Sequence, residues 1–156
     1  MATETMTRKD LITALNGDLA REYQAVIAYV VYSKVRKGAE YMAIAKELEK
    51  HAAQELAHAL KISKHIDYLG GTPTTKALDV KTSDDPRQLL RFDLDNENDT
   101  VKHYRERVRQ CEAMQEYGIA EDIREILRQE QEHQIDLATA LGEEVPDVSE
   151  LTTSKR

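Results

Sequence analysis

Apolar residues recur along most of the chain at alternating steps of three and four positions, which places them on one face of a helix. Glycine and proline interrupt this pattern and divide the chain into four long segments. Each segment is rich in Ala, Leu, Glu, Lys, Arg and Gln, the residues that favour helices most strongly. We therefore predict an all-α fold with four helices, at roughly residues 8–37, 40–69, 86–117 and 119–141.

The connections between the predicted helices differ in length. Gly38 and Gly118 mark two tight turns, whereas a long segment from Gly70 to Asp85 separates the second helix from the third. Tight turns join antiparallel neighbours, so we expect a four-helix bundle made of two antiparallel hairpins and one long crossover between them.

The apolar face of each predicted helix contains one glutamate. These residues are Glu22, Glu55, Glu97 and Glu130. A carboxylate in the core of a bundle is costly unless something neutralises its charge. The four glutamates therefore require a chemical explanation.

The polar positions on these faces repeat along the chain. Glu55 begins a Glu-x-x-His sequence that ends at His58, and a second one runs from Glu130 to His133. A single Glu-x-x-His has little meaning, because it arises easily by chance. Here every member of the first half recurs 75 positions later, as the pairs Glu22 and Glu97, Tyr29 and Tyr104, Glu55 and Glu130, and His58 and His133.

The residue types in this repeat point to metal binding. Residues three positions apart on a helix point the same way, so each Glu-x-x-His presents a carboxylate and an imidazole together. Four carboxylates balance two divalent cations, and a mixed oxygen and nitrogen shell suits iron or manganese. Ferritin-like bundles hold two metal ions in this arrangement. A polar core without metal is the alternative.

The sequence resembles the bacterioferritin branch of the ferritin-like superfamily over about residues 8–142, through the stretches 55–58, 93–97 and 126–133. The resemblance implies two iron ions per subunit, with manganese as a second option. It also implies six ligands for these ions. They are two terminal carboxylates, Glu22 and Glu97, two bridging carboxylates, Glu55 and Glu130, and two imidazoles, His58 and His133.

The same resemblance implies an activity. The protein is expected to be a ferroxidase subunit of an iron-storage or iron-detoxifying cage, with Fe²⁺ and oxygen or hydrogen peroxide as substrates. Tyr29 matches the family's tyrosine beside the di-iron centre and is expected to be catalytic, as an electron donor. A core tyrosine that only bonds a carboxylate is the alternative. A dimetal peroxidase, manganese catalase or oxygenase, and a DNA-protecting mini-ferritin, are alternative functions for the chain.

Three departures from the family pattern carry expectations of their own. Leu56 stands where haem-binding bacterioferritins have a methionine, so we expect no haem, because leucine has no ligand atom. Gln54 replaces a common acidic residue, which argues against an inner-surface iron site. The polar tail at 143–156 shows no fifth helix of the kind found in 24-subunit cages, so a homo-oligomeric cage of twelve subunits is favoured.

Length and charge narrow the function further. A chain of 156 residues suits a single domain over residues 1–156, with the bundle at about 8–142 followed by the tail. The 29 acidic residues outnumber the 22 basic ones and give a net charge of −7, so we expect no nucleic-acid partner. No apolar run is long enough to span a membrane, and the first nine residues are polar, so we expect a cytoplasmic protein without a membrane partner.

The remaining histidines and the single cysteine give weaker signals. His51 and His65 lie seven positions on either side of His58, and for them a solvated or structural role is favoured over the guidance of iron. His103 is expected at the surface. Cys111 is expected to pack as a small apolar residue, since one cysteine cannot form a disulfide within the chain.

Overall fold

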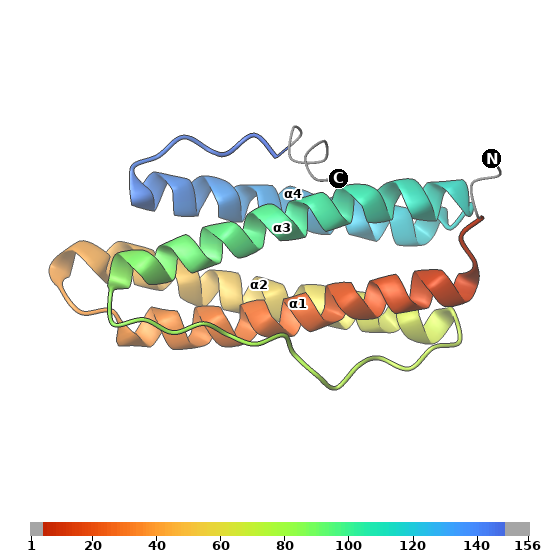
Figure 1. Cartoon of the computed structure of the whole chain (residues 1–156), viewed down its shortest axis with the longest axis horizontal. Coiled ribbons are helices and arrows are strands. Elements are labelled where there is room, and N and C mark those ends of the chain that lie inside the picture. The colour runs from red at the N-terminus through yellow and green to blue at the C-terminus, as the bar shows by residue number, and fades with distance from the viewer. Residues whose placement is uncertain (1–4, 149–156) are drawn as a thin grey trace, which may run out of the picture.

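The computed structural model describes residues 5–148, which form four long helices lying alongside one another (Figure 1). The elements are α1 (Arg8–Val35), a short 3₁₀ helix η1 (Ala39–Tyr41), α2 (Met42–Tyr68), α3 (Pro86–Ala113) and α4 (Tyr117–Leu141). No strand occurs among the described residues, so the predicted all-α fold is confirmed. None of the described helices combines the length and apolar character that a membrane crossing requires.

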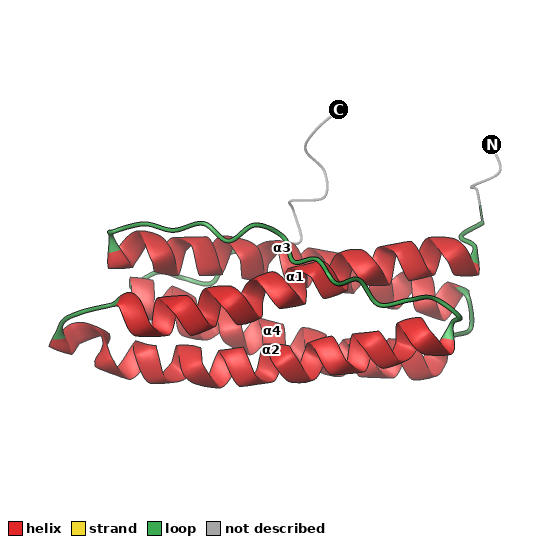
Figure 2. Ribbon diagram, turned by 90° about the horizontal axis from the view of Figure 1, so that it is seen from below, coloured by secondary structure: helices red, strands yellow, loops and turns green. Residues whose placement is uncertain are grey.

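The helices form two antiparallel hairpins, α1 with α2 and α3 with α4, and the connection between the hairpins runs along the bundle (Figure 2). Hydrogen bonds hold this crossover against α1. The Asn16 side chain bonds the backbone of Thr72 and Thr74, at 3.1 and 2.7 Å, and the Leu78 amide donates to the Ala20 carbonyl at 3.2 Å. The predicted topology of two hairpins joined by a long crossover is therefore confirmed.

Side-chain caps set the starts of α1 and α3. The Thr7 hydroxyl accepts from the Asp10 amide at 3.1 Å, and the Asp10 carboxylate accepts from the Thr7 amide at 2.8 Å. Asp85 accepts from the Arg87 amide at 3.0 Å. These bonds satisfy amide groups that have no partner inside the first helical turn, which is why both helices begin where they do.

The predicted helix boundary at Gly118 is wrong by a few residues. The helix α3 ends at Ala113, and Gly118 lies inside α4. Gln115 takes the left-handed conformation, with a φ of 62°, and the Glu116 amide donates to the Cys111 carbonyl at 2.8 Å. Glycine is the residue that usually ends a helix in this way. A glutamine in that place left no stop signal in the sequence.

The buried apolar side chains form two clusters, one toward each end of the bundle. Leu15 and Ile62 belong to the first cluster, and Leu48 and Leu137 belong to the second. The four glutamates of the repeat lie between these clusters along every helix, and all are buried. The fold thus places a polar layer between two close-packed apolar ones.

Candidate metal centre

All six residues predicted to bind two metal ions come together in the polar layer. Their exposed fractions do not exceed 3 %. Each long helix contributes at least one of them: Glu22 from α1, Glu55 and His58 from α2, Glu97 from α3, and Glu130 and His133 from α4.

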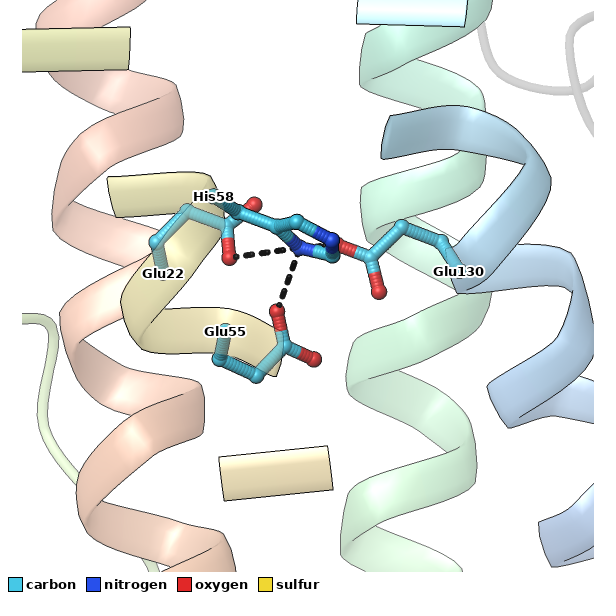
Figure 3. A group of neighbouring side chains, drawn as sticks. All are labelled: Glu22, Glu55, His58 and Glu130. Atoms are coloured by element: carbon cyan, nitrogen blue, oxygen red, sulfur yellow. Dashed lines mark hydrogen bonds and ion pairs between the residues drawn. The ribbon is translucent and has the colours of Figure 1, made fainter. Parts of the chain in front are cut away.

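The first group of ligand atoms surrounds Nδ1 of His58 (Figure 3). This nitrogen lies 3.0 Å from Oε2 of Glu55, 3.2 Å from Oε1 of Glu130 and 3.5 Å from Oε2 of Glu22. A ring nitrogen carries at most one proton, so it cannot satisfy three carboxylates at once. Ligand atoms that converge in this way are able to surround one cation.

The second group repeats the arrangement around Nδ1 of His133. This nitrogen lies 3.0 Å from Oε1 of Glu55, 3.0 Å from Oε2 of Glu130 and 3.5 Å from Oε1 of Glu97. Glu55 and Glu130 therefore each direct one oxygen to each group. Because the His58 and His133 ring centroids are 6.3 Å apart, the two groups are neighbours that share these two carboxylates.

The crowded carboxylates shift the pKa values of this layer in both directions. Burial and the neighbouring carboxylates raise the pKa of Glu130 to about 7 and that of Glu55 well above its ordinary value. Burial acts in the same sense on Glu97, but hydrogen bonding to His133 outweighs it, and the pKa of Glu97 falls to about 2. Burial opposes the charged form of His58, but the surrounding carboxylates outweigh it and raise its pKa. The metal-free layer therefore holds protons that a cation would displace.

Several oxygens of the layer have no hydrogen-bond partner among the described residues. They are Oε2 of Glu22, Oε1 of Glu55, Oε2 of Glu97 and both oxygens of Glu130. Buried polar atoms are ordinarily paired, because they have lost their hydration. Two divalent cations would satisfy these oxygens and balance four negative charges, so the residues present fit a dimetal group.

One glutamine bonds the outer nitrogen of each of the two imidazoles. Oε1 of Gln129 lies 2.6 Å from Nε2 of His58, and Oε1 of Gln54 lies 2.7 Å from Nε2 of His133. An amide oxygen only accepts, so Nε2 carries a proton and Nδ1 is left to offer its lone pair to a cation. These two glutamines were not predicted from the sequence, although Gln54 and Gln129 also stand 75 positions apart.

Two tyrosines bond the outer carboxylates. The Tyr29 hydroxyl donates to Oε1 of Glu97, and the Tyr104 hydroxyl donates to Oε1 of Glu22. Burial and the nearby carboxylates raise the pKa of both tyrosines well above the ordinary value, so both phenols keep their protons. Tyr29 also meets the His133 ring edge-on, with the ring centroids 6.0 Å apart.

The other residues singled out in the sequence lie outside these two groups. His103 is exposed and Cys111 is buried among apolar residues, as predicted. His51 is 1 % exposed and stacks on the His133 ring with centroids 4.0 Å apart, so of the two expected roles, solvated or structural, its burial agrees with the structural one. Its burial comes from the packing of α2 against α4. His65 is buried as well.

A sequence model of the ferritin-like domain matches residues 12–144. The chain belongs to the ferritin-like family. This ferritin-like chain is 33 % identical over 97 residues to bacterioferritin from Rhodobacter capsulatus, and the match covers 62 % of this chain and 60 % of that protein. The relative is thus matched over less than two thirds of its length.

Two solved structures resemble this ferritin-like protein along most of the bundle. A ferritin-like, diiron-carboxylate protein of Bacillus anthracis gives a TM-score of 0.83 at 32 % identity, covering 87 % of this chain and 99 % of that one. A dodecameric thioferritin, the bacterioferritin-related protein of Bacteroides fragilis, gives 0.81 at 28 % identity and covers 88 % of each chain. The protein is a bacterioferritin-like member of its family.

Proposed function

We propose that this chain is the ferroxidase subunit of an iron-storage or iron-detoxifying cage. The observation that supports the proposal most directly is the sharing of Glu55 and Glu130 between two groups, each built around the Nδ1 atom of one histidine. The ligands of the two iron ions in each subunit would be Glu22, Glu55, His58, Glu97, Glu130 and His133.

The chain's own residues would prepare this site in three ways. The four carboxylates attract Fe²⁺ and balance two such ions, while Gln54 and Gln129 keep the Nδ1 atoms directed inward. The apolar clusters on either side would keep water and competing reductants away. The iron pair, when bound, supplies two electrons to the oxidant. Oxygen would take up two protons and leave as hydrogen peroxide, or hydrogen peroxide would take up two protons and leave as two waters.

The test of this function is Fe²⁺ oxidation by the metal-free protein. Increasing amounts of Fe²⁺ are mixed with the protein in aerated buffer, and Fe³⁺ formation is followed by absorbance. A ferroxidase with this centre is expected to show a fast phase that saturates at two Fe²⁺ per subunit. Fast release of oxygen from hydrogen peroxide by the manganese-loaded protein would instead favour a catalase, and failure to bind either metal would favour a metal-free bundle.

We further propose that Tyr29 is catalytic and gives one electron and its phenolic proton to the oxidant in place of one of the two iron electrons, so that the oxidant still receives two electrons in all. Tyr29→Phe is expected to abolish a tyrosyl radical that the unaltered protein forms after mixing with Fe²⁺ and oxygen, detected by electron paramagnetic resonance. Tyr104→Phe is the matched control, because it removes the same kind of hydroxyl–carboxylate bond from the other group. A radical of equal intensity in Tyr29→Phe would leave this tyrosine with a hydrogen-bonding role only.

The surface supports assembly with further copies of the chain. Apolar side chains are exposed on α1 and α2, where the exposed fractions of Ile27, Leu56 and Leu60 are 44 %, 53 % and 65 %. Ile27 and Leu56 line one shared surface pocket. Exposed apolar patches of this kind mark protein contacts. We propose that subunits meet at this surface. We also propose that no haem binds at Leu56, because the leucine side chain has no donor atom for the haem iron.

We propose a cage of twelve subunits. Residues 143–148 form no helix, and the rest of the predicted tail, 149–156, lies outside the described residues. The Bacteroides fragilis relative is dodecameric. Light scattering on the purified protein is expected to give about 214 kDa, the mass of twelve chains of 17.8 kDa. A mass near 427 kDa would mean twenty-four chains, and a stable dimer would contradict storage in a closed shell.

A further inference from the structure

Three histidines of α2 face α4 at steps of seven residues, and each bonds a polar side chain there. Because the helices are antiparallel, the partners on α4 also step by seven, in the opposite order. The distances are 3.0, 2.6 and 2.7 Å for the pairs His51 with Asp136, His58 with Gln129, and His65 with Asp122. His58 of the middle pair is a ligand of the dimetal group, whereas the outer pairs lie outside the two groups of ligand atoms around His58 and His133.

The two outer pairs differ in the residue that lies one helical turn before the histidine on α2. Before His51 the residue is Glu47, and one ligand atom each from Glu47, His51 and Asp136 lie within 4.8 Å of one another. The corresponding residue before His65 is Lys61. Its ammonium group pairs with the carboxylate of Glu125, on α4, 2.9 Å away. Two carboxylates and an imidazole therefore converge at the first pair, and a positive charge stands beside the last.

This trio lies between solvent and the dimetal group. The His51 ring is buried and stacks on the ring of His133, with centroids 4.0 Å apart. Glu47 and Asp136 are partly exposed and line a surface pocket of about 550 Å³. The carboxylates thus meet the pocket, while the imidazole touches a residue of the metal layer on its inner side.

The charge and chemistry of the trio suit a divalent cation. Two carboxylates balance a charge of two, and one nitrogen with two oxygens matches the preference of first-row transition metals. Calcium and magnesium prefer shells made of oxygen alone. The Glu47 carboxylate is paired with Lys50 at 3.0 Å, but the two side chains are 40 % and 67 % exposed. An exposed pair of this kind contributes little, so a cation bound by all three groups can displace the lysine.

We propose that Glu47, His51 and Asp136 form a third divalent-cation site, at which Fe²⁺ binds on its way from the surface pocket to the dimetal group. The role in delivery rests on the proposed ferroxidase function, whereas the site itself does not. His51 has the position for transfer, because its ring contacts a residue of the dimetal group directly.

Cobalt binding tests the site without oxidation chemistry. Metal-free protein is titrated with Co²⁺, and bound metal is counted after equilibrium dialysis. The double variant Glu47→Gln, Asp136→Asn is expected to bind one Co²⁺ per subunit fewer than the unaltered protein. The matched control is Asp122→Asn, Glu125→Gln, which makes the same chemical changes beside the last histidine pair and is expected to lose none. Equal binding by the two double variants would overturn the site.

The rate of Fe²⁺ oxidation tests the delivery role. At low Fe²⁺ the Glu47→Gln, Asp136→Asn variant is expected to oxidise iron about tenfold more slowly than the control, because the local concentration of the cation falls. The total amount of Fe²⁺ that the variant oxidises at saturation should not change, because all six ligands of the dimetal group are present. Loss of one Co²⁺ with an unchanged rate would overturn the delivery role alone. If the unaltered protein oxidised no iron, the ferroxidase proposal would fail, and cobalt binding would still decide the site.

Discussion

Fast Fe²⁺ oxidation is expected to fall more than about 100-fold when Glu130 is replaced by alanine. Glu130 presents Oε1 to the His58 group and Oε2 to the His133 group, so the substitution removes one ligand from both cations at once. Stopped-flow absorbance measures the rate. Circular dichroism is expected to show unchanged helix content, because the neighbouring apolar clusters remain intact.

The control for this variant is Glu132→Ala, on the same helix. Glu132 is exposed and lies outside both groups of ligand atoms, so its loss removes one negative charge and no ligand. Oxidation at the normal rate is expected there. Oxidation by Glu130→Ala at the rate of this control would remove Glu130 from the site and with it the shared-carboxylate geometry.

The metal-free protein is expected to lose stability as the pH rises above about 5. The pKa of Glu130 is about 7 in the fold against an ordinary 4.5, so between these values the folded state binds more protons than the unfolded chain. The free energy of unfolding therefore falls as the pH rises through this window. The raised pKa values of His58 and His133 extend the loss beyond pH 6.5, because there only the folded state keeps these protons.

Glu97 has the opposite effect on stability at low pH, where the free energy of unfolding falls as the pH falls. Its pKa is lowered to about 2, so its contribution to stability is complete above 4.5 and disappears as the pH falls toward 2. Together the two effects place the best stability of the metal-free protein in mildly acidic solution. Melting temperatures measured from pH 3 to pH 9 check this, and a metal-free protein that became steadily more stable up to pH 9 would contradict it.

Bound metal is expected to reverse the loss at neutral pH. A cation present at about a thousand times its dissociation constant adds about 4 kcal/mol to the free energy of unfolding, which raises the melting temperature of a chain this long by about 10 °C. The metal added is Mn²⁺, or Fe²⁺ in the absence of oxygen, and the melting temperature is measured by scanning calorimetry. Glu130→Ala should show a much smaller rise. An equal rise in both proteins would mean that the metal stabilises the fold from another place.

The helices and most of the centre could be predicted because they depend on local spacing. Steps of three and four residues define the helical faces, and the 75-residue repeat selects one glutamate on each. Gln54 and Gln129 obey the same repeat, so they too were within reach of sequence reasoning. Glu55 reaches both groups because of its side-chain torsion angles, which residue spacing does not determine. Only the resemblance to a family suggested that this carboxylate is shared.

Features that depend on the register between helices could not be predicted. His51 is buried because α2 and α4 are aligned so that Asp136 lies opposite it, and nothing near His51 in the chain specifies that alignment. The end of α3 is a second case. Gln115 adopts a left-handed conformation that is ordinarily given to glycine, so the residue type at this position did not indicate the end of the helix.

The two halves of the repeat also bear on the order of folding. Each hairpin contains one Glu-x-x-His, yet the ligands around His58 and those around His133 both come from the two hairpins. Contacts within a hairpin are close in sequence and form early, whereas docking brings four carboxylates together and is slowed by their repulsion. A divalent cation relieves that repulsion at the docking step. Iron supply would then set how quickly new chains reach the native state, as well as how much iron the finished protein holds.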